Sequence, residues 1–98
     1  MASSEPLWLE AALEDAEEAR NWYAERSPLA ARGFLLELQA AALAVAEAPE
    51  RWPIYSHGCR RYVFPHKYPY SLVYRYGPPV QIVAVAHGKR RPGFWAKR

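Results

Sequence analysis

The sequence predicts an α+β domain in which an N-terminal antiparallel helical hairpin packs on a C-terminal antiparallel β-sheet of three or four strands. Apolar side chains recur every three or four residues over positions 10–47, whereas they alternate with period two over positions 59–87. Because the helical segments precede the strand segments in the chain, the pattern favours a two-layer domain with a helical layer packed on a sheet. The 98 residues are too few for two independent cores, so we expect a single domain over 1–98, closed by a basic tail at 88–98.

The helical hairpin is predicted from two amphipathic segments and the break between them. The first helix should cover residues 10–26, with acidic side chains in its early turns, where the helix dipole favours anions. Ser27 can cap a new helix and Pro28 is tolerated at its first position. The second helix should therefore run from Pro28 to Glu47, ended by Pro49 and Pro53.

The second helix carries apolar side chains on two opposite sides. Phe34, Leu38, Ala41 and Val45 share one side, and the other side holds a second set at helical spacing: Leu36, Ala40 and Leu43. A helix on the surface of a two-layer domain needs one apolar stripe. Either the helix is sandwiched and both stripes are core, or the second stripe docks a partner, and the sequence favours neither.

The strands are predicted at residues 59–64, 70–76 and 80–87. Gly77-Pro78-Pro79 makes a turn between the last two, and the largely apolar segment 80–87 should be the central strand. Residues 6–9 could form a short additional strand.

Charge is divided between the two halves of the chain. Residues 1–50 hold all ten acidic side chains and three arginines, whereas residues 51–98 hold ten basic side chains and no acid. The basic half also carries ten of the fourteen aromatic residues. Cations interleaved with flat rings suit RNA, and they also suit an acidic protein partner. Exposed cations on an aromatic-rich sheet would also arise without any partner. We expect an anionic partner.

Composition excludes several classes of protein. A single cysteine, Cys59, forms no internal disulfide, and the three histidines are 9 and 21 residues apart, which does not match a zinc site. We expect Cys59 to be a buried thiol, and we expect no metal and no cofactor. No apolar run approaches the roughly 20 residues of a membrane span, and no signal sequence is present, so a cytoplasmic protein without membrane contact is expected.

One metal-independent reaction is compatible with the basic half. Cleavage of RNA by attack of the 2′-hydroxyl needs a proton acceptor, a proton donor and cations that stabilise the phosphorane. The candidates for these roles are His66, Lys67, His87, Arg90 and Arg91. For each of them taken alone, an exposed charge on a sheet edge or tail is the favoured interpretation.

Four segments of the chain together resemble the RelE/ParE toxin superfamily, in its ParE-like plasmid-stabilisation branch. They are WYAERSP at 22–28, APERWP at 48–53, RRYVFPHKYPYSLVYR at 60–75 and IVAVAHGKRRPGFW at 82–95. The similarity extends over about residues 8–95. It implies the toxin of a type II toxin–antitoxin system, with the same arrangement of helical hairpin and sheet. It also implies growth arrest, neutralisation by a cognate antitoxin and a possible hetero-oligomer with that antitoxin.

The resemblance implies one of two activities. RelE-like toxins cleave mRNA on the ribosome with basic side chains and a C-terminal tyrosine, whereas ParE-like toxins inhibit DNA gyrase. Here Ser71 stands at the position of the sheet arginine and Trp95, which has no hydroxyl, at that of the tyrosine. A ParE-like gyrase inhibitor that is not an enzyme is therefore favoured. The alternatives are a ribosome-dependent endoribonuclease using His66, Lys67, His87 and Arg90, and a non-toxic antitoxin-binding module.

Two sets of surface residues follow from this hypothesis. Leu36, Ala40 and Leu43 are expected to bind the antitoxin. The residues expected to bind the target are Arg60, Arg61, Lys67, Arg75, Lys89, Arg90, Arg91 and Trp95.

Overall fold

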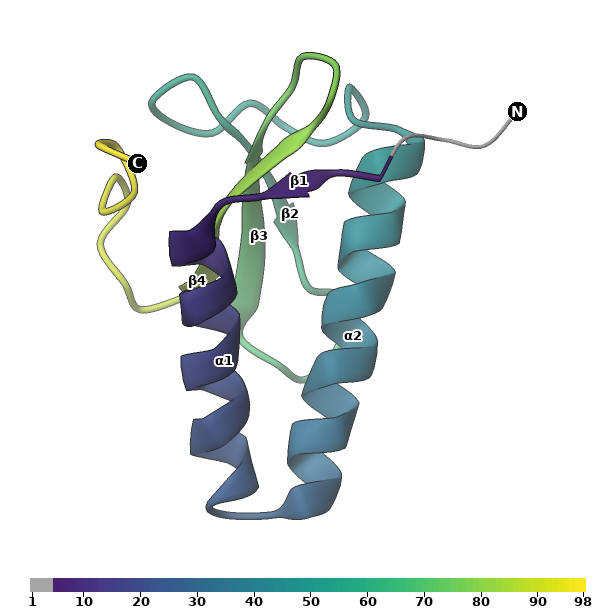
Figure 1. Cartoon of the computed structure of the whole chain (residues 1–98), viewed down its shortest axis with the longest axis vertical. Helices are drawn as coiled ribbons and strands as arrows, with labels where there is room; N and C mark the ends of the chain where they lie inside the picture. The colour runs from purple at the N-terminus through teal and green to yellow at the C-terminus, as the bar shows by residue number, and fades with distance from the viewer. Residues whose placement is uncertain (1–4) are drawn as a thin grey trace.

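A computed structural model of the chain describes residues 5–98. Two helices, α1 (Glu10–Ala24) and α2 (Pro28–Glu47), pack on one face of a four-stranded sheet whose strand order is β1-β4-β3-β2 (Figure 1). The strands are β1 (Leu7–Trp8), β2 (Arg60–Val63), β3 (Tyr70–Arg75) and β4 (Gln81–His87). The predicted α+β architecture is confirmed.

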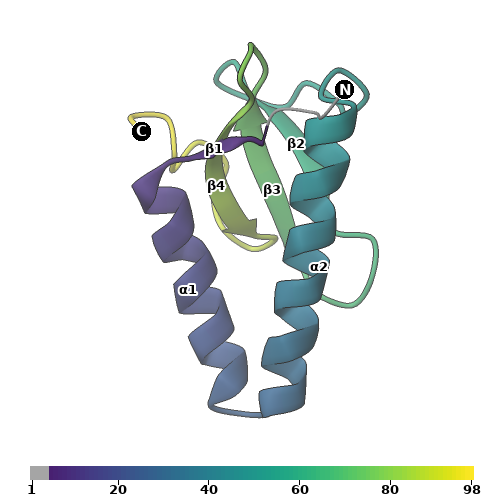
Figure 2. The same ribbon diagram turned by 45° about the vertical axis from the view of Figure 1, so that its right-hand side comes forward.

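The two helices are joined by a short corner that extends beyond the sheet (Figures 1 and 2). Ser27 caps α2 as predicted, because its hydroxyl oxygen accepts a hydrogen bond from the Ala30 N–H at 3.2 Å. Pro28 occupies the first helical position, and the predicted bounds of α2 are confirmed. The first helix ends at Ala24, two residues before the predicted end, where the Ser27 N–H already bonds the Tyr23 carbonyl.

The sheet is mixed, which corrects the prediction of an antiparallel sheet. β2, β3 and β4 pair antiparallel, but β1 lies parallel to β4, with Leu7 opposite Gln81. β1 is the first strand and β4 the last, so both helices, β2 and β3 lie between them in the chain, and a connection of this length allows parallel pairing. β4 is central, as predicted, with β1 on one side and β3 on the other.

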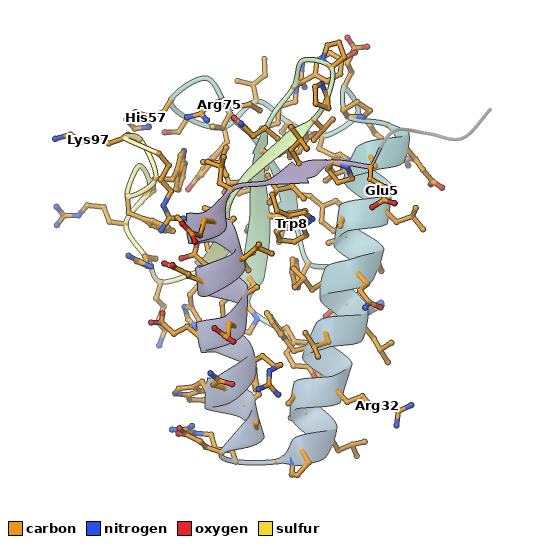
Figure 3. The ribbon with its side chains drawn as sticks, in the orientation of Figure 1. Glu5, Trp8, Arg32, His57, Arg75 and Lys97 are labelled. Atoms are coloured by element: carbon orange, nitrogen blue, oxygen red, sulfur yellow. The ribbon has the colours of Figure 1, made fainter. Side chains whose placement is uncertain are left out.

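The main core lies between the sheet and the helical hairpin. Phe34 and Leu38 from α2 meet Leu72 and Tyr74 from β3 and Ile82 from β4, all at most 7% exposed. From β1, the Trp8 side chain points into the space between the two helices (Figure 3) and packs against this cluster.

A second, smaller core covers the opposite face of the sheet. Val73 and Val83 from the sheet contact Cys59 and Trp95, and each of these side chains is at most 1% exposed. The segment after β4 therefore folds back over the sheet, where Figure 1 shows the yellow end of the chain beside β4. Burial of both faces explains why β4 is apolar along almost its whole length.

An ion pair holds the end of this segment. The Arg98 guanidinium donates to Asp15 of α1 at 2.6 and 3.2 Å and to the Val83 carbonyl at 3.1 Å. Asp15 also accepts the Val85 N–H at 3.1 Å, so one carboxylate joins α1, β4 and the tail.

The α2 helix has the length and apolar composition of a membrane span. This corrects the expectation that no segment of the chain approaches such a length of apolar residues. Here α2 packs one side against the sheet and buries Phe34, Leu38, Ala41 and Val45.

Candidate partner and target surfaces

The second apolar stripe of α2 is on the surface. Leu36 is 59% exposed and Leu43 57% exposed, and Ala40 between them is exposed as well. The opposite side of the same helix is core, so the alternative in which α2 is sandwiched between two layers is wrong. A contiguous row of exposed leucines and alanine on a well-packed helix is the kind of surface that another protein covers.

This stripe borders a groove of about 680 Å³ between α2 and the segment that joins β2 to β3. Leu29, Leu36 and Ala40 line it from α2, and Tyr62 and Pro65 line it from the other side. Gly33 lies against the Tyr68 ring, whose hydroxyl donates to the Ala30 carbonyl at 2.7 Å. A side chain at position 33 would meet that hydroxyl, so a glycine is what lets the Tyr68 ring reach the helix.

One charged side chain is buried in the groove wall. Glu37 is 8% exposed, and its Oε2 accepts the backbone N–H of His66 at 3.1 Å. The His66 ring lies farther away, with its Nε2 3.9 Å from the same oxygen, and it is largely exposed. The other oxygen, Oε1, has no hydrogen-bond partner among residues 5–98.

Four of the predicted target-binding cations gather at one end of the sheet. Lys67 lies in the segment between β2 and β3, and Lys89, Arg90 and Arg91 follow β4 directly. A hydrogen bond from the Gly88 N–H to the Pro69 carbonyl, at 2.8 Å, holds these two segments together. All four side chains are exposed, and we call this group the basic end.

The remaining three arginines lie at the other end of the sheet and make intramolecular contacts. Arg60 donates to the carbonyls of Glu50 and Trp52, at 3.3 and 2.7 Å. The Arg61 guanidinium lies 4.0 Å from the centre of the Tyr55 ring. Arg75 donates to Gln81 at 3.0 Å and to the main-chain oxygen of Arg98 at 3.4 Å. The cations therefore do not form one continuous face.

Trp95 is buried, which corrects its prediction as a contact for the target. It is 1% exposed and stacks on Tyr55, with ring centres 5.5 Å apart. Phe64, Tyr68 and Tyr74 are at most 6% exposed as well. These rings are core side chains, because they supply the apolar area that both faces of the sheet need. These four rings are therefore not available to stack on bases.

The candidate residues for RNA cleavage line different hollows. His66 and Lys67 line the α2 groove, whereas His87 and Arg90 line a hollow of about 580 Å³ beside α1, together with Tyr70 and Glu18. His87 Nδ1 accepts the Lys89 N–H at 3.0 Å, so the neutral ring carries its proton on Nε2.

The Tyr70 hydroxyl is a poor proton donor in this hollow. Burial raises its pKa above the ordinary value, and the neighbouring Tyr23 and Glu18 raise it further. An efficient general acid has a pKa near the working pH, so the shift is in the wrong direction for that role.

Cys59 is buried, and its surroundings disfavour the thiolate that a nucleophile needs. Its thiol donates to the His57 carbonyl at 3.6 Å, and burial raises its pKa. This confirms the interpretation of Cys59 as a buried thiol. Within the described part of the chain, 5–98, no group of three His, Cys, Asp or Glu side chains is placed to hold a metal ion.

Two functional features were not predicted from the sequence. Neither Asp15 nor Glu37 was singled out from the sequence, yet one anchors the tail and the other lies in the groove wall. For Glu37 a signal was available, since it is the acid that interrupts the apolar segment 34–46 of α2. Nothing local to Asp15 indicates its pairing with a residue 83 positions away.

Comparison with known proteins assigns the family. A search of curated protein sequences found no match to the chain. A family model described as the ParE toxin of the type II toxin–antitoxin system parDE matches residues 7–92, from β1 to just beyond the basic end. The match covers most of the chain and the six helices and strands that residues 5–98 form. The chain therefore belongs to the ParE toxin family of type II toxin–antitoxin systems.

Proposed function

We propose that the chain is a toxin that inhibits DNA gyrase by binding it and that a cognate antitoxin neutralises it by covering the exposed stripe of α2. The stripe carries the proposal, because Leu36 and Leu43 are more than half exposed on a helix whose other side is core. Covering these side chains and the adjoining groove removes apolar area from water, which is the main source of affinity in a helix-in-groove complex.

The basic end is proposed to contact the target. Lys67, Lys89, Arg90 and Arg91 are exposed at one end of the sheet, and a cluster of this kind favours an acidic surface and accelerates association with it. The three arginines at the other end are used in internal contacts and are assigned a structural role. Since gyrase acts in the cytoplasm, we place the toxin there.

Binding without catalysis is favoured over RNA cleavage by the nature of the side chains. Ser71 is buried and neutral where a RelE-like toxin would have an arginine, and Trp95 is buried and has no hydroxyl. The groups that could transfer protons are divided between two hollows.

The test combines three measurements on the purified or induced protein. Supercoiling of a relaxed plasmid by gyrase should be blocked, growth should stop on induction, and primer extension should find translated mRNA intact. Cut mRNA with unaffected supercoiling would instead establish the endoribonuclease. Normal growth and supercoiling, with antitoxin binding retained, would establish a non-toxic antitoxin-binding module.

The docking site is tested separately by co-purification with the antitoxin of the pair. Leu36→Asp and Leu43→Asp should each abolish the complex, because a carboxylate would be buried against apolar side chains. Leu13→Asp is the matched control, since Leu13 is 52% exposed on α1, away from the groove. Retention of the complex by both α2 variants would refute the docking site.

A further inference from the structure

The α2 groove contains a buried carboxylate, Glu37, of which one oxygen accepts a hydrogen bond and the other accepts none from residues 5–98. Glu37 lies in the groove wall, 8% exposed, with Oε2 bonded to the His66 N–H. Its Oε1 is buried and has no hydrogen-bond partner among residues 5–98. A carboxylate oxygen held in this way is a strong acceptor that gains more from a donor than an exposed carboxylate would.

The cations around the groove do not neutralise Glu37. Of the described residues, His66 is the one with a basic nitrogen within 4.0 Å, and its ring is 79% exposed. Arg32 and Lys67 line the same groove, but both are exposed, and Arg32 projects from α2 away from the molecule (Figure 3). The groove is therefore apolar, with an acidic point in its wall and a cationic rim.

We infer that Glu37 selects an antitoxin segment that inserts a lysine or arginine between apolar side chains. Leu29, Leu36 and Ala40 would contact the apolar side chains, while Glu37 Oε1 accepts a hydrogen bond from the inserted ammonium or guanidinium group. Acidic side chains flanking that residue would lie near Arg32 and Lys67. This inference rests on the proposed docking of the antitoxin on α2 and adds the chemistry that distinguishes the cognate partner from other amphipathic segments.

A buried carboxylate is well suited to discriminating between partners. A segment with an apolar side chain opposite Glu37 would bury the charge without a partner, whereas a basic side chain would compensate it. The binding free energy lost with an apolar segment is larger than the net binding free energy gained with a basic one. Glu37 would therefore discriminate mainly by weakening the binding of the wrong partner.

The test measures the affinity of the antitoxin of the pair for Glu37→Gln by titration calorimetry. Glutamine keeps the size of the side chain and an oxygen for the His66 N–H, so the fold should persist, as circular dichroism will check. Removing the charge should weaken binding by about tenfold or more. Glu47→Gln is the matched control, because Glu47 is exposed on the same helix and should leave affinity unchanged.

The basic residue of the antitoxin is located by changing each of its lysines and arginines to methionine. One such change should weaken binding to the wild-type toxin about tenfold and have no further effect on Glu37→Gln. If Glu37→Gln does not fold, the scan of the antitoxin against wild-type toxin tests the inference by itself. The inference would be overturned if no lysine or arginine change in the antitoxin weakened binding.

The outcomes separate this inference from the proposed docking site. Equal affinity of Glu37→Gln and wild type, with binding lost in Leu36→Asp, would refute the role of Glu37 and leave the docking site intact. Unchanged affinity in both variants would refute both.

Discussion

Removal of the Arg98 side chain should release the segment that covers the second face of the sheet. The Arg98 guanidinium makes two hydrogen bonds to Asp15 and one to the Val83 carbonyl, and the two side chains are 21% and 9% exposed. In Arg98→Ala the Asp15 carboxylate loses its cation while it remains buried and bonded to the Val85 N–H.

The expected loss follows from this geometry. Breaking a fully buried ion pair by deleting one partner costs about 3–5 kcal/mol, and the partial exposure of Arg98 lowers the expected cost to about 2–3 kcal/mol. For a domain of this size that loss corresponds to a fall in Tm of about 10–20 °C. Trp95 should become accessible in the same variant, because the segment that carries it is no longer anchored.

The assay is urea denaturation followed by far-ultraviolet circular dichroism. Lys97→Ala is the matched control, since Lys97 is exposed beside Arg98 and should change the free energy of unfolding by less than about 0.5 kcal/mol. The double variant Asp15→Asn/Arg98→Ala should show a coupling energy of about 1–3 kcal/mol. Equal stability of Arg98→Ala and Lys97→Ala would refute the anchoring role of the ion pair.

Three further changes test the packing. Burial raises the pKa of Tyr74 to about 12, so the folded state holds this proton more tightly than the unfolded chain does. This difference in pKa contributes about 2–3 kcal/mol to the free energy of unfolding, which is fully present below pH 10 and is lost between about pH 10 and 12. The free energy of unfolding of Tyr74→Phe should therefore fall less than that of wild type over this pH range. Gly33→Ala should destabilise by about 1–3 kcal/mol in urea, although alanine is the better helix former, because the new methyl group meets the Tyr68 hydroxyl; a gain in stability would contradict that close contact. Trp95→Ala should cost about 3–5 kcal/mol by the same assay, and a loss below about 1 kcal/mol would contradict its place in the core.

Local patterns in the sequence predicted most of the fold. The Ser27-Pro28 break predicted the start of α2, and alternation along 70–76 predicted β3, because capping and side-chain period act over a few residues. The parallel pairing of β1 was missed, since a two-residue strand carries no period and its partner is more than seventy residues away.

The candidate site was predicted less completely than the fold. Helical spacing placed Leu36, Ala40 and Leu43 on one side of α2 without deciding between core and surface, and the structure leaves that stripe exposed. The cations expected to bind the target lie at both ends of the sheet, because the order and direction of the strands decide where each cation is placed. Trp95 was expected at the target-binding surface, but it is buried, because a large ring gains more free energy by burial.

The measurement that tests the account most directly is inhibition of gyrase supercoiling by wild-type toxin and by a variant with Lys89, Arg90 and Arg91 changed to alanine. We expect the wild-type protein to block supercoiling, the variant to require a much higher concentration, and both to bind the antitoxin with equal affinity. Supercoiling that continues at saturating wild-type toxin would contradict the proposed target. Equal inhibition by the two proteins would contradict the assignment of the basic end.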